Sequence, residues 1–161
     1  MRLRPDLSGR KRAESEVEAY LQEHIPLSAD MGVRVLTAGP RGVVLEAPLE
    51  PNVNHRSSAF GGSVAAVAML AGWALVHLRL SAEGLAAETV IHRGEMRYDA
   101  PIYGPFRALC ERVADKPWLR FTKAISKHGK GRIGLVVTVE AGGAAVASLG
   151  ASYVALAAGK R

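Results

Sequence analysis

The residues best suited to chemistry in this sequence lie between Asn52 and Leu78. A polar loop that contains Asn54 leads to Gly61 and Gly62, and a long Ala-rich apolar segment follows. If that segment is a helix, its first N–H groups have no partner within the helix, and the helix dipole adds partial positive charge there. The glycines carry no Cβ atom, so another molecule can come close to the backbone. The junction is therefore suited to hold a group that carries or gains negative charge.

The composition is that of one folded domain. The chain has 161 residues, of which 48% are hydrophobic, and a net charge of +6. Its single cysteine, Cys110, excludes an internal disulfide and fits a reducing compartment, so we expect a cytoplasmic protein. The basic, polar start has no apolar stretch typical of a signal peptide. We expect residues 1–13 to form a basic arm and residues 14–161 to form the domain.

Hydrophobic periodicity predicts the elements around this junction. Apolar residues at helical spacing predict a helix over 14–24, which ends before Pro26. Alternating apolar residues predict strands near 31–35 and 43–49, joined by a turn over 39–42. The segment from Gly61 to about Leu80 is apolar on all sides, so we expect a helix buried all round. Its strictly apolar core is short for a membrane span, and we expect no membrane association.

The second half of the sequence predicts four further strands and a second amphipathic helix. The strands are expected over 89–100, 105–114, 132–141 and 144–156. The helix between the two pairs has an apolar face and a face of basic residues. A long helix that is apolar all round needs a sheet wrapped around it. We therefore predict an α+β hotdog fold, in which an antiparallel sheet of about six strands wraps around the central helix, and we expect a second subunit to complete its burial.

The stretch PNVNHRSSAFGGSVAAVAMLAGW, residues 51–73, resembles the thioesterase family named for the C-terminal domain of the YiiD protein. The later stretches RYDAPIYGPFRA and GKGRIGLVVTVEAGGAAVASLGASYVAL fit the family pattern too, and the resemblance covers about residues 14–157. It implies a hotdog enzyme that acts on short acyl thioesters, with an active site at a subunit interface. It also implies fatty-acid metabolism, since some members of the family are malonyl-carrier-protein decarboxylases that supply acetyl primers.

The resemblance implies roles for the residues of the junction. The N–H groups of Gly61 and Gly62 would hold the thioester oxygen as it gains negative charge, with Asn54 as a side-chain donor. Many hotdog thioesterases have a histidine where this chain has Phe60, and an acid in the central helix near Met69. Both are replaced here, and the segment from Gly61 to Leu80 has no carboxylate.

The missing acid leaves two chemistries open. Hydrolysis needs a group that activates water, for which His55 is the candidate, and Glu95 and Asp99 are expected on a solvated strand face. Decarboxylation of a malonyl thioester needs stabilisation of the oxygen but no general base, so the acid-free helix slightly favours it. A non-catalytic acyl-thioester binder is the alternative of a different class. The residues expected to assist or to contact substrate are His55, Ser57, Ser58, Phe60, Ser63 and Met69; the two serines before Ala59 could also be turn or N-cap residues.

The basic helix face predicts a docking surface. Four basic residues follow one another at helical spacing without an acidic residue among them, which would steer an acidic acyl carrier protein or the phosphates of coenzyme A. These residues are Lys116, Arg120, Lys123 and Lys127. We expect no cofactor beyond the coenzyme A or phosphopantetheine of the substrate, no metal, because the histidines lack ligand spacing, and no nucleic acid, because zinc-finger and aromatic RNA-binding patterns are missing. We expect a homodimer or a dimer of dimers.

Overall fold

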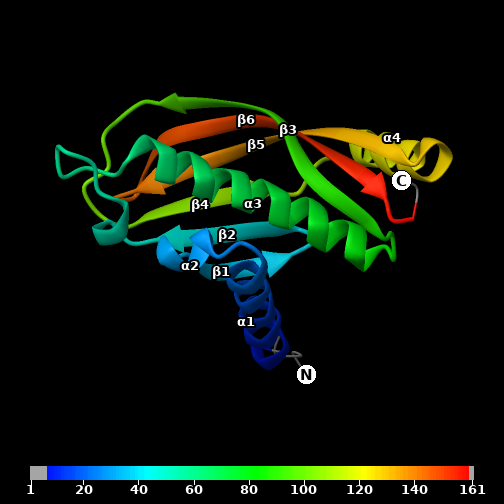
Figure 1. The fold of residues 1–161 in the computed structure, drawn as a ribbon, viewed down its shortest axis with the longest axis horizontal. Helices are drawn as coiled ribbons and strands as arrows, with labels where there is room; N and C mark the ends of the chain where they lie inside the picture. The colour runs from blue at the N-terminus through cyan, green and yellow to red at the C-terminus, as the bar shows by residue number, and fades with distance from the viewer. Residues whose placement is uncertain (1–6, 160–161) are drawn as a thin grey trace, which may run out of the picture.

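Six antiparallel strands form one sheet that curves around a long central helix (Figure 1). The computed structural model describes residues 7–159. The sheet order is β1-β2-β4-β5-β6-β3, and helix α3, Gly61–Ala82, lies in its concave face. The strands are β1 (Arg34–Gly39), β2 (Gly42–Ala47), β3 (Ala87–Tyr98), β4 (Phe106–Glu111), β5 (Lys130–Ala141) and β6 (Ala144–Ala157). This arrangement confirms the predicted α+β hotdog fold.

Helix α3 is the centre of the hydrophobic core. Its sheet-facing side chains, among them Val67, Ala71 and Leu75, are almost completely buried. Length and composition alone would allow α3 to cross a membrane, but here it is the core helix of the sheet. Within one chain the sheet covers only part of this helix, so burial all round, completed by the expected second subunit, stays a prediction. Met69 and Trp73 are only partly buried, because the sheet ends at β3 and leaves this side of the helix open.

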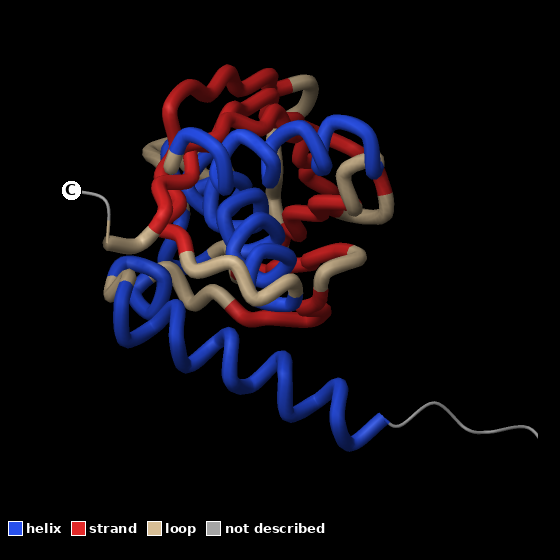
Figure 2. The backbone as a smooth tube through the Cα atoms, turned by 90° about the vertical axis from the view of Figure 1, so that its right-hand side faces the viewer, coloured by secondary structure: helices blue, strands red, loops and turns tan. Residues whose placement is uncertain are grey.

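Helix α1 (Leu7–His24) starts earlier than the sequence predicted, so residues 7–13 of the expected basic arm are helical; residues 1–6 lie outside the described part of the chain. The helix extends away from the body of the domain (Figure 2). Leu21 anchors it in the core, and the ring of Tyr20 stacks with those of Trp73 and His77. Beyond Pro26, a short helix α2 (Leu27–Asp30), which the periodicity did not predict, leads to β1.

Helix α4 (Asp115–His128) has the predicted two faces. Trp118, Phe121 and Ile125 are buried, and the chain leaves the helix at Gly129, which has a left-handed φ of 73°. Arg79 near the C-terminal end of α3 lies under this helix. Its guanidinium is 4.1 Å from the centre of the Trp118 ring, and its Nη1 donates a 2.7 Å hydrogen bond to the carbonyl of Val113. Helix α4 is thereby held at the C-terminal end of α3.

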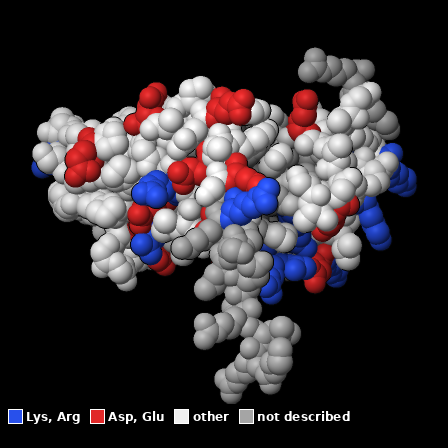
Figure 3. Space-filling view, turned by 90° about the horizontal axis from the view of Figure 1, so that it is seen from below, with Lys and Arg blue, Asp and Glu red and all other residues white. Residues whose placement is uncertain are grey.

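The positive net charge does not produce one continuous basic surface. On the face seen from below, lysine and arginine side chains lie among aspartate and glutamate side chains (Figure 3). Arg107 and Glu46, for example, form a 2.7 Å ion pair across β4 and β2. Local rows of unpaired cations such as that of α4 are therefore more informative about partners than the net charge is.

Candidate active site

The loop before α3 is held by the side chain of Asn54. Its Oδ1 accepts hydrogen bonds from the backbone N–H groups of Arg56 and Ser58, at 2.8 and 3.2 Å, and its Nδ2 donates to Ser58 Oγ at 3.0 Å. A longer 3.4 Å contact joins Nδ2 to the carbonyl of Ala59. Ser57, between the bonded residues, has a left-handed φ of 61°. The predicted catalytic residue Asn54 thus first of all fixes a tight turn.

Helix α3 begins without a side-chain cap. Its N-cap is Phe60, with φ −65° and ψ 127°, and its side chain makes no capping hydrogen bond to the first N–H groups of the helix. Of the two structural roles expected for Ser57 and Ser58, turn or N-cap, the structure shows the turn, because both lie in the loop before Phe60 and Ser58 is bonded to Asn54. Apolar residues cannot accept a hydrogen bond at this position, so the first N–H groups of α3 stay available. The Phe60 ring is 55% exposed and packs so closely over Gly62 that it occupies the place of a Cβ atom.

Tyr98 joins the far end of β3 to the start of α3. Its phenolic oxygen donates a 2.6 Å hydrogen bond to the carbonyl of Gly61. A Cβ atom at Gly61 would lie 3.3 Å from this ring, so the glycine allows the close approach. Burial raises the pKa of Tyr98 above its ordinary value, so the hydroxyl stays protonated as a donor further into alkali than that of an exposed tyrosine.

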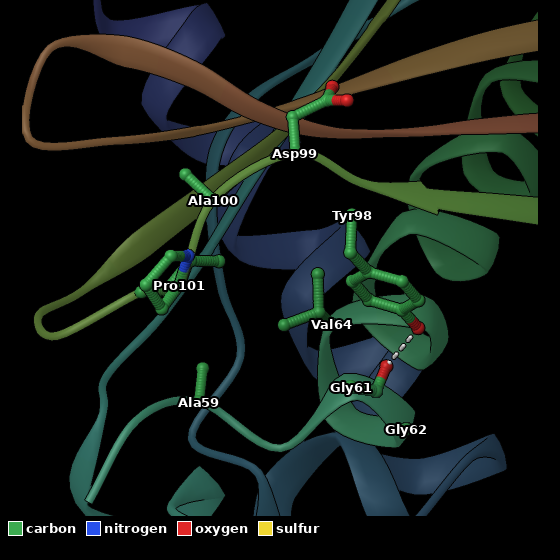
Figure 4. Close-up of a pocket in the computed structure, with 9 residues that line it drawn as sticks. Ala59, Gly61, Gly62, Val64, Tyr98, Asp99, Ala100 and Pro101 are labelled. Carbon is green, nitrogen blue, oxygen red and sulfur yellow. Dashed lines mark hydrogen bonds between the residues drawn. The ribbon is translucent and has the colours of Figure 1, made fainter.

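An open cleft of about 490 Å³ lies between the start of α3 and the segment after β3 (Figure 4). Gly61 and Gly62 form one wall with Val64, and Ala59 and Pro101 lie opposite (Figure 4). The remaining lining residues are Tyr98, Asp99, Ala100 and Ile102. The cleft is thus mainly apolar, with the uncapped turn of α3 at its edge, which suits a small acyl group whose carbonyl faces backbone donors.

Asp99, which directly follows β3, is the acidic residue among those that line this cleft, and it is exposed, as expected for a solvated position. Its carboxylate forms an ion pair with Arg97, with 2.9 Å between Nε and Oδ1, and its side chain is half exposed. In Figure 4 the Asp99 carboxylate points away from Gly61, while the Tyr98 ring points toward Gly61. Glu95, the other acid considered on this strand, is exposed. The cleft wall formed by α3 remains free of carboxylates, as the sequence shows.

The structure brings together only some of the predicted site residues. Gly61 and Gly62 line the cleft, and Phe60 lies directly beside it. His55 and Ser57 are exposed on the loop and do not line it. Ser63 is partly buried in the first turn of α3, outside the lining. The roles expected for these residues stay predictions.

Met69 lies further along α3, about 12 Å from Gly61 at the helical rise of 1.5 Å per residue. Its side chain faces Gly94 of β3 rather than the cleft, and its carbonyl accepts a 2.7 Å hydrogen bond from the hydroxyl of buried Tyr153. Within one chain, Met69 therefore belongs to the open stripe of α3. A role in shaping an acyl pocket would require that stripe to be covered.

Tyr98 is the site residue that reasoning from the sequence missed. A strand that follows a helix and runs back beside it brings its last residues to the level of the first helical turn. The predicted strand 89–100 follows the helix from Gly61, so its length already placed Tyr98 near Gly61. Asn52 was missed too: it is buried, and its Nδ2 donates to the carbonyls of Met31 and Pro48, which fixes the start of the loop.

The chain is similar to thioesterases in sequence and in structure. The family model described as "Putative thioesterase (yiiD_Cterm)" matches residues 14–157. A solved protein of unknown function from Chlorobaculum tepidum TLS is 28% identical, with a TM-score of 0.86 over 92% of this chain and 96% of that one. A putative thioesterase from Shewanella oneidensis is 22% identical, with a TM-score of 0.80 over 91% and 99%. A thioesterase from Haemophilus influenzae is 8% identical, with a TM-score of 0.72 over 92% and 93%, and shows the fold alone.

Proposed function

The chain belongs to the putative thioesterase family whose model matches residues 14–157, and from this premise we propose that it is an enzyme acting on short acyl thioesters at the start of α3. The observation that carries the proposal is the uncapped first turn of α3 at the edge of an apolar cleft. Backbone N–H groups of Gly61 and Gly62 would donate to the thioester oxygen as it gains charge. One such donor contributes about 3–4 kcal/mol to lowering a barrier of this kind.

Hydrolysis is the reaction that the family favours. A water oxygen adds to the thioester carbonyl carbon, the C–S bond breaks, and the sulfur leaves as a thiol after taking a proton. Asp99 and His55 are the candidates for accepting the proton of the water. The addition of water and the loss of the thiol both pass through an intermediate with a negatively charged oxygen. The first turn of α3 is placed to stabilise that charge.

Decarboxylation of a malonyl thioester is the second candidate. Here the bond between the carboxyl carbon and the α-carbon breaks, CO₂ leaves, and the electron pair forms an enolate that takes a proton at carbon to give an acetyl thioester. The specific observation in its favour is that α3 presents no carboxylate to the cleft and that Asp99 is paired with Arg97 and turned away from Gly61. The cleft would then hold the charged substrate without repulsion from a nearby acid.

Asn54 would act mainly by position in either reaction. Its bonds to Arg56 and Ser58 fix the turn that carries Phe60 and Gly61. The 3.4 Å contact with the Ala59 carbonyl is weak, so this hydrogen of Nδ2 is the one that could turn to a substrate oxygen.

We further propose a homodimer formed through β3, in the cytoplasm. β3 is an edge strand of twelve residues, and Val90 and Ile91 on it are 52% and 40% exposed. The open stripe of α3, with Met69 and Trp73, lies behind this edge. A long edge with exposed apolar side chains is a surface that pairs with another strand.

The test is mass spectrometry of a carrier protein loaded with malonate or with a short acyl group, incubated with the purified protein; the same groups on coenzyme A run in parallel. Loss of the whole acyl group from either substrate indicates hydrolysis. Loss of CO₂ from the malonyl form, with the remaining acetyl group still on the carrier, indicates decarboxylation. Substrate that binds but stays unchanged would show a binding module and overturn the proposal.

A further inference from the structure

The row of cations on α4 forms no ion pair with an acidic side chain in the part of the chain that the structure describes. Lys116, Arg120, Lys123 and Lys127 are all exposed on the face opposite the buried side chains of the helix. Among residues 7–159, no acidic side chain forms an ion pair with any of the four. The row extends over about 16 Å at the rise of an α-helix.

This row lies at the opposite end of α3 from the cleft of the same chain. Arg79 and Trp118 hold α4 at the C-terminal end of α3, whereas the cleft is at Gly61. Helix α3 has 22 residues, which correspond to about 32 Å. A carrier bound to α4 would therefore lie roughly 30 Å from the cleft of the same subunit.

Strand β3 connects the same two ends of the molecule. Its last residue, Tyr98, bonds to Gly61 beside the cleft. Its first residue, Ala87, pairs with Ala157 of β6, whose N–H donates to the carbonyl of Gly129 directly after α4. The start of β3 therefore lies near α4, and the end of β3 lies beside the cleft.

Antiparallel pairing of two β3 edges about a two-fold axis exchanges these ends. The start of one β3 then lies beside the end of the other, and neighbouring strands are only about 4.8 Å apart. The edge has complementary charges for such pairing: if Gly94 lies on the axis, Arg93 of each strand faces Glu95 of the other. The end of α4 in one subunit, near Gly129, would then lie about 14 Å, three strand spacings, from the end of β3 in its partner, with β3 and β6 of its own subunit in between.

We propose that α4 of each subunit docks an acidic acyl carrier protein whose acyl thioester reacts at Gly61 and Gly62 of the partner subunit. The proposal rests on the proposed function and on pairing through β3. A groove of about 510 Å³ lies on the side of α4 that faces the start of β3. It is lined by Glu83, Leu85, Thr122, Lys123, Ser126 and Lys127.

The carrier fits this surface better than coenzyme A does. The four cations form a straight, exposed row along a helix instead of converging on one point, as phosphate binding would require. A row of this kind matches acidic side chains on a facing helix and increases the association rate at low salt.

Mixed dimers test the exchange of sites. One subunit carries Gly61→Pro, which removes an N–H donor of the cleft, and the other carries Lys123→Glu with Lys127→Glu; differently tagged subunits are purified together. If docking is in trans, one of the two sites in the mixed dimer combines an intact cleft with an intact α4. The mixed dimer should then reach about half the wild-type kcat/KM on carrier-bound substrate, although both parental dimers have low activity. A mixed dimer no better than its parents would overturn the proposal.

The choice of ligand is tested with the charge-reversed homodimer. We expect its kcat/KM to fall by about tenfold or more on carrier-bound substrate at low salt, and to change little on the coenzyme A thioester. Arg34→Glu with Arg41→Glu, an equal charge change at exposed positions near the opposite sheet edge, should leave both unchanged. An equal loss on coenzyme A would overturn carrier docking in favour of phosphate binding.

A cross-link tests the arrangement without any assay of activity. Asp99→Cys and Lys127→Cys in one chain lie near opposite ends of β3, which is about 36 Å long. A bismaleimide shorter than about 20 Å should therefore join them only between subunits and give a covalent dimer on a denaturing gel. Native Cys110 is buried and should not react, and each single-cysteine variant serves as control. The absence of a cross-linked dimer would overturn the proposal. A cross-link, together with a wild-type protein that is inactive on all thioesters, would overturn the proposed function alone.

Discussion

The hydroxyl of Tyr98 donates a 2.6 Å hydrogen bond to the carbonyl oxygen of Gly61, and this bond ties the end of the edge strand to the first turn of the central helix. The helix and the strand are joined at their other ends by a short connection between Ala82 and Ala87. The bond therefore closes the open end of an antiparallel pair. It also fixes the spacing across the cleft in which we place the reaction.

Tyr98→Phe should keep the fold and lower activity. The loss of one hydrogen bond at a half-exposed site should reduce the free energy of unfolding by about 0.5–1.5 kcal/mol. We expect kcat to fall several-fold, because the first turn of α3 is held less firmly. Tyr103→Phe is the matched control, since Tyr103 is 69% exposed and its hydroxyl has no hydrogen bond to the described residues. Equal kcat and Tm in both variants would show that the bond does not position the site.

Gly72→Ala should destabilise the core through Tyr153. A Cβ atom at Gly72 would lie 2.5 Å from the Tyr153 hydroxyl oxygen, which is buried and bonded to the carbonyl of Met69. Overpacking of this kind costs about 1–3 kcal/mol, measurable by urea unfolding. Tyr153→Phe in the same chain removes the nearest of the close atoms and leaves ring carbons at 2.9 and 3.0 Å, so the double variant should lose less stability than the sum of the two single variants. Simple additivity would argue against the collision.

Cys110 should make the protein less stable in alkali. Burial raises the pKa of its thiol from 9.0 to about 12, so between these values the unfolded chain releases a proton that the folded chain keeps. The unfolded state then binds fewer protons, and the free energy of unfolding falls by up to about 1.4 kcal/mol per pH unit as the pH rises. Cys110→Ala should show a shallower fall between pH 8 and 10 in urea unfolding, a range in which the buried Tyr153 contributes little. Parallel curves for the two proteins would contradict this.

Ile91→Asp should weaken the proposed dimer. Ile91 is on the open edge strand, and a charge there would be buried by pairing of two β3 strands. We expect light scattering after gel filtration to show a shift toward monomer. Leu156→Asp is the control, because Leu156 has the same exposed fraction of 40% but lies on β6, within the sheet. A dimer that tolerates Ile91→Asp and dissociates with Leu156→Asp would place the interface elsewhere.

Most of the fold could be predicted from the sequence because its pattern is unambiguous. An apolar segment without charges from Gly61 to Val76, placed between alternating strands, has few alternatives to a helix inside a sheet. The boundaries were less predictable. The start of α1 at Leu7 lies in a basic segment without apolar periodicity, and Met31 and Val33 are buried just before β1 rather than within it.

The site was only partly predictable, because its geometry depends on hydrogen bonds between distant segments. The position of Gly61 and Gly62 followed from the helix start alone. To predict the contact of Tyr98 with Gly61, the length of β3 had to be known. To predict the bonds of Asn54 within its own loop, the left-handed conformation of Ser57 had to be known. No pattern of residue types in the sequence indicates either one.

The most direct test of the account compares Gly61→Pro with Gly61→Ala. Both add a Cβ atom at 3.3 Å from the Tyr98 ring, but only proline removes the N–H group. The backbone tolerates proline here, because it is favoured at the first helical position and because Phe60 before it is extended. If the first turn of α3 holds the thioester oxygen, kcat of the proline variant should be about 10²–10³ lower than that of the alanine variant, at equal Tm. Equal kcat values would show that the N–H of Gly61 has no part in the reaction.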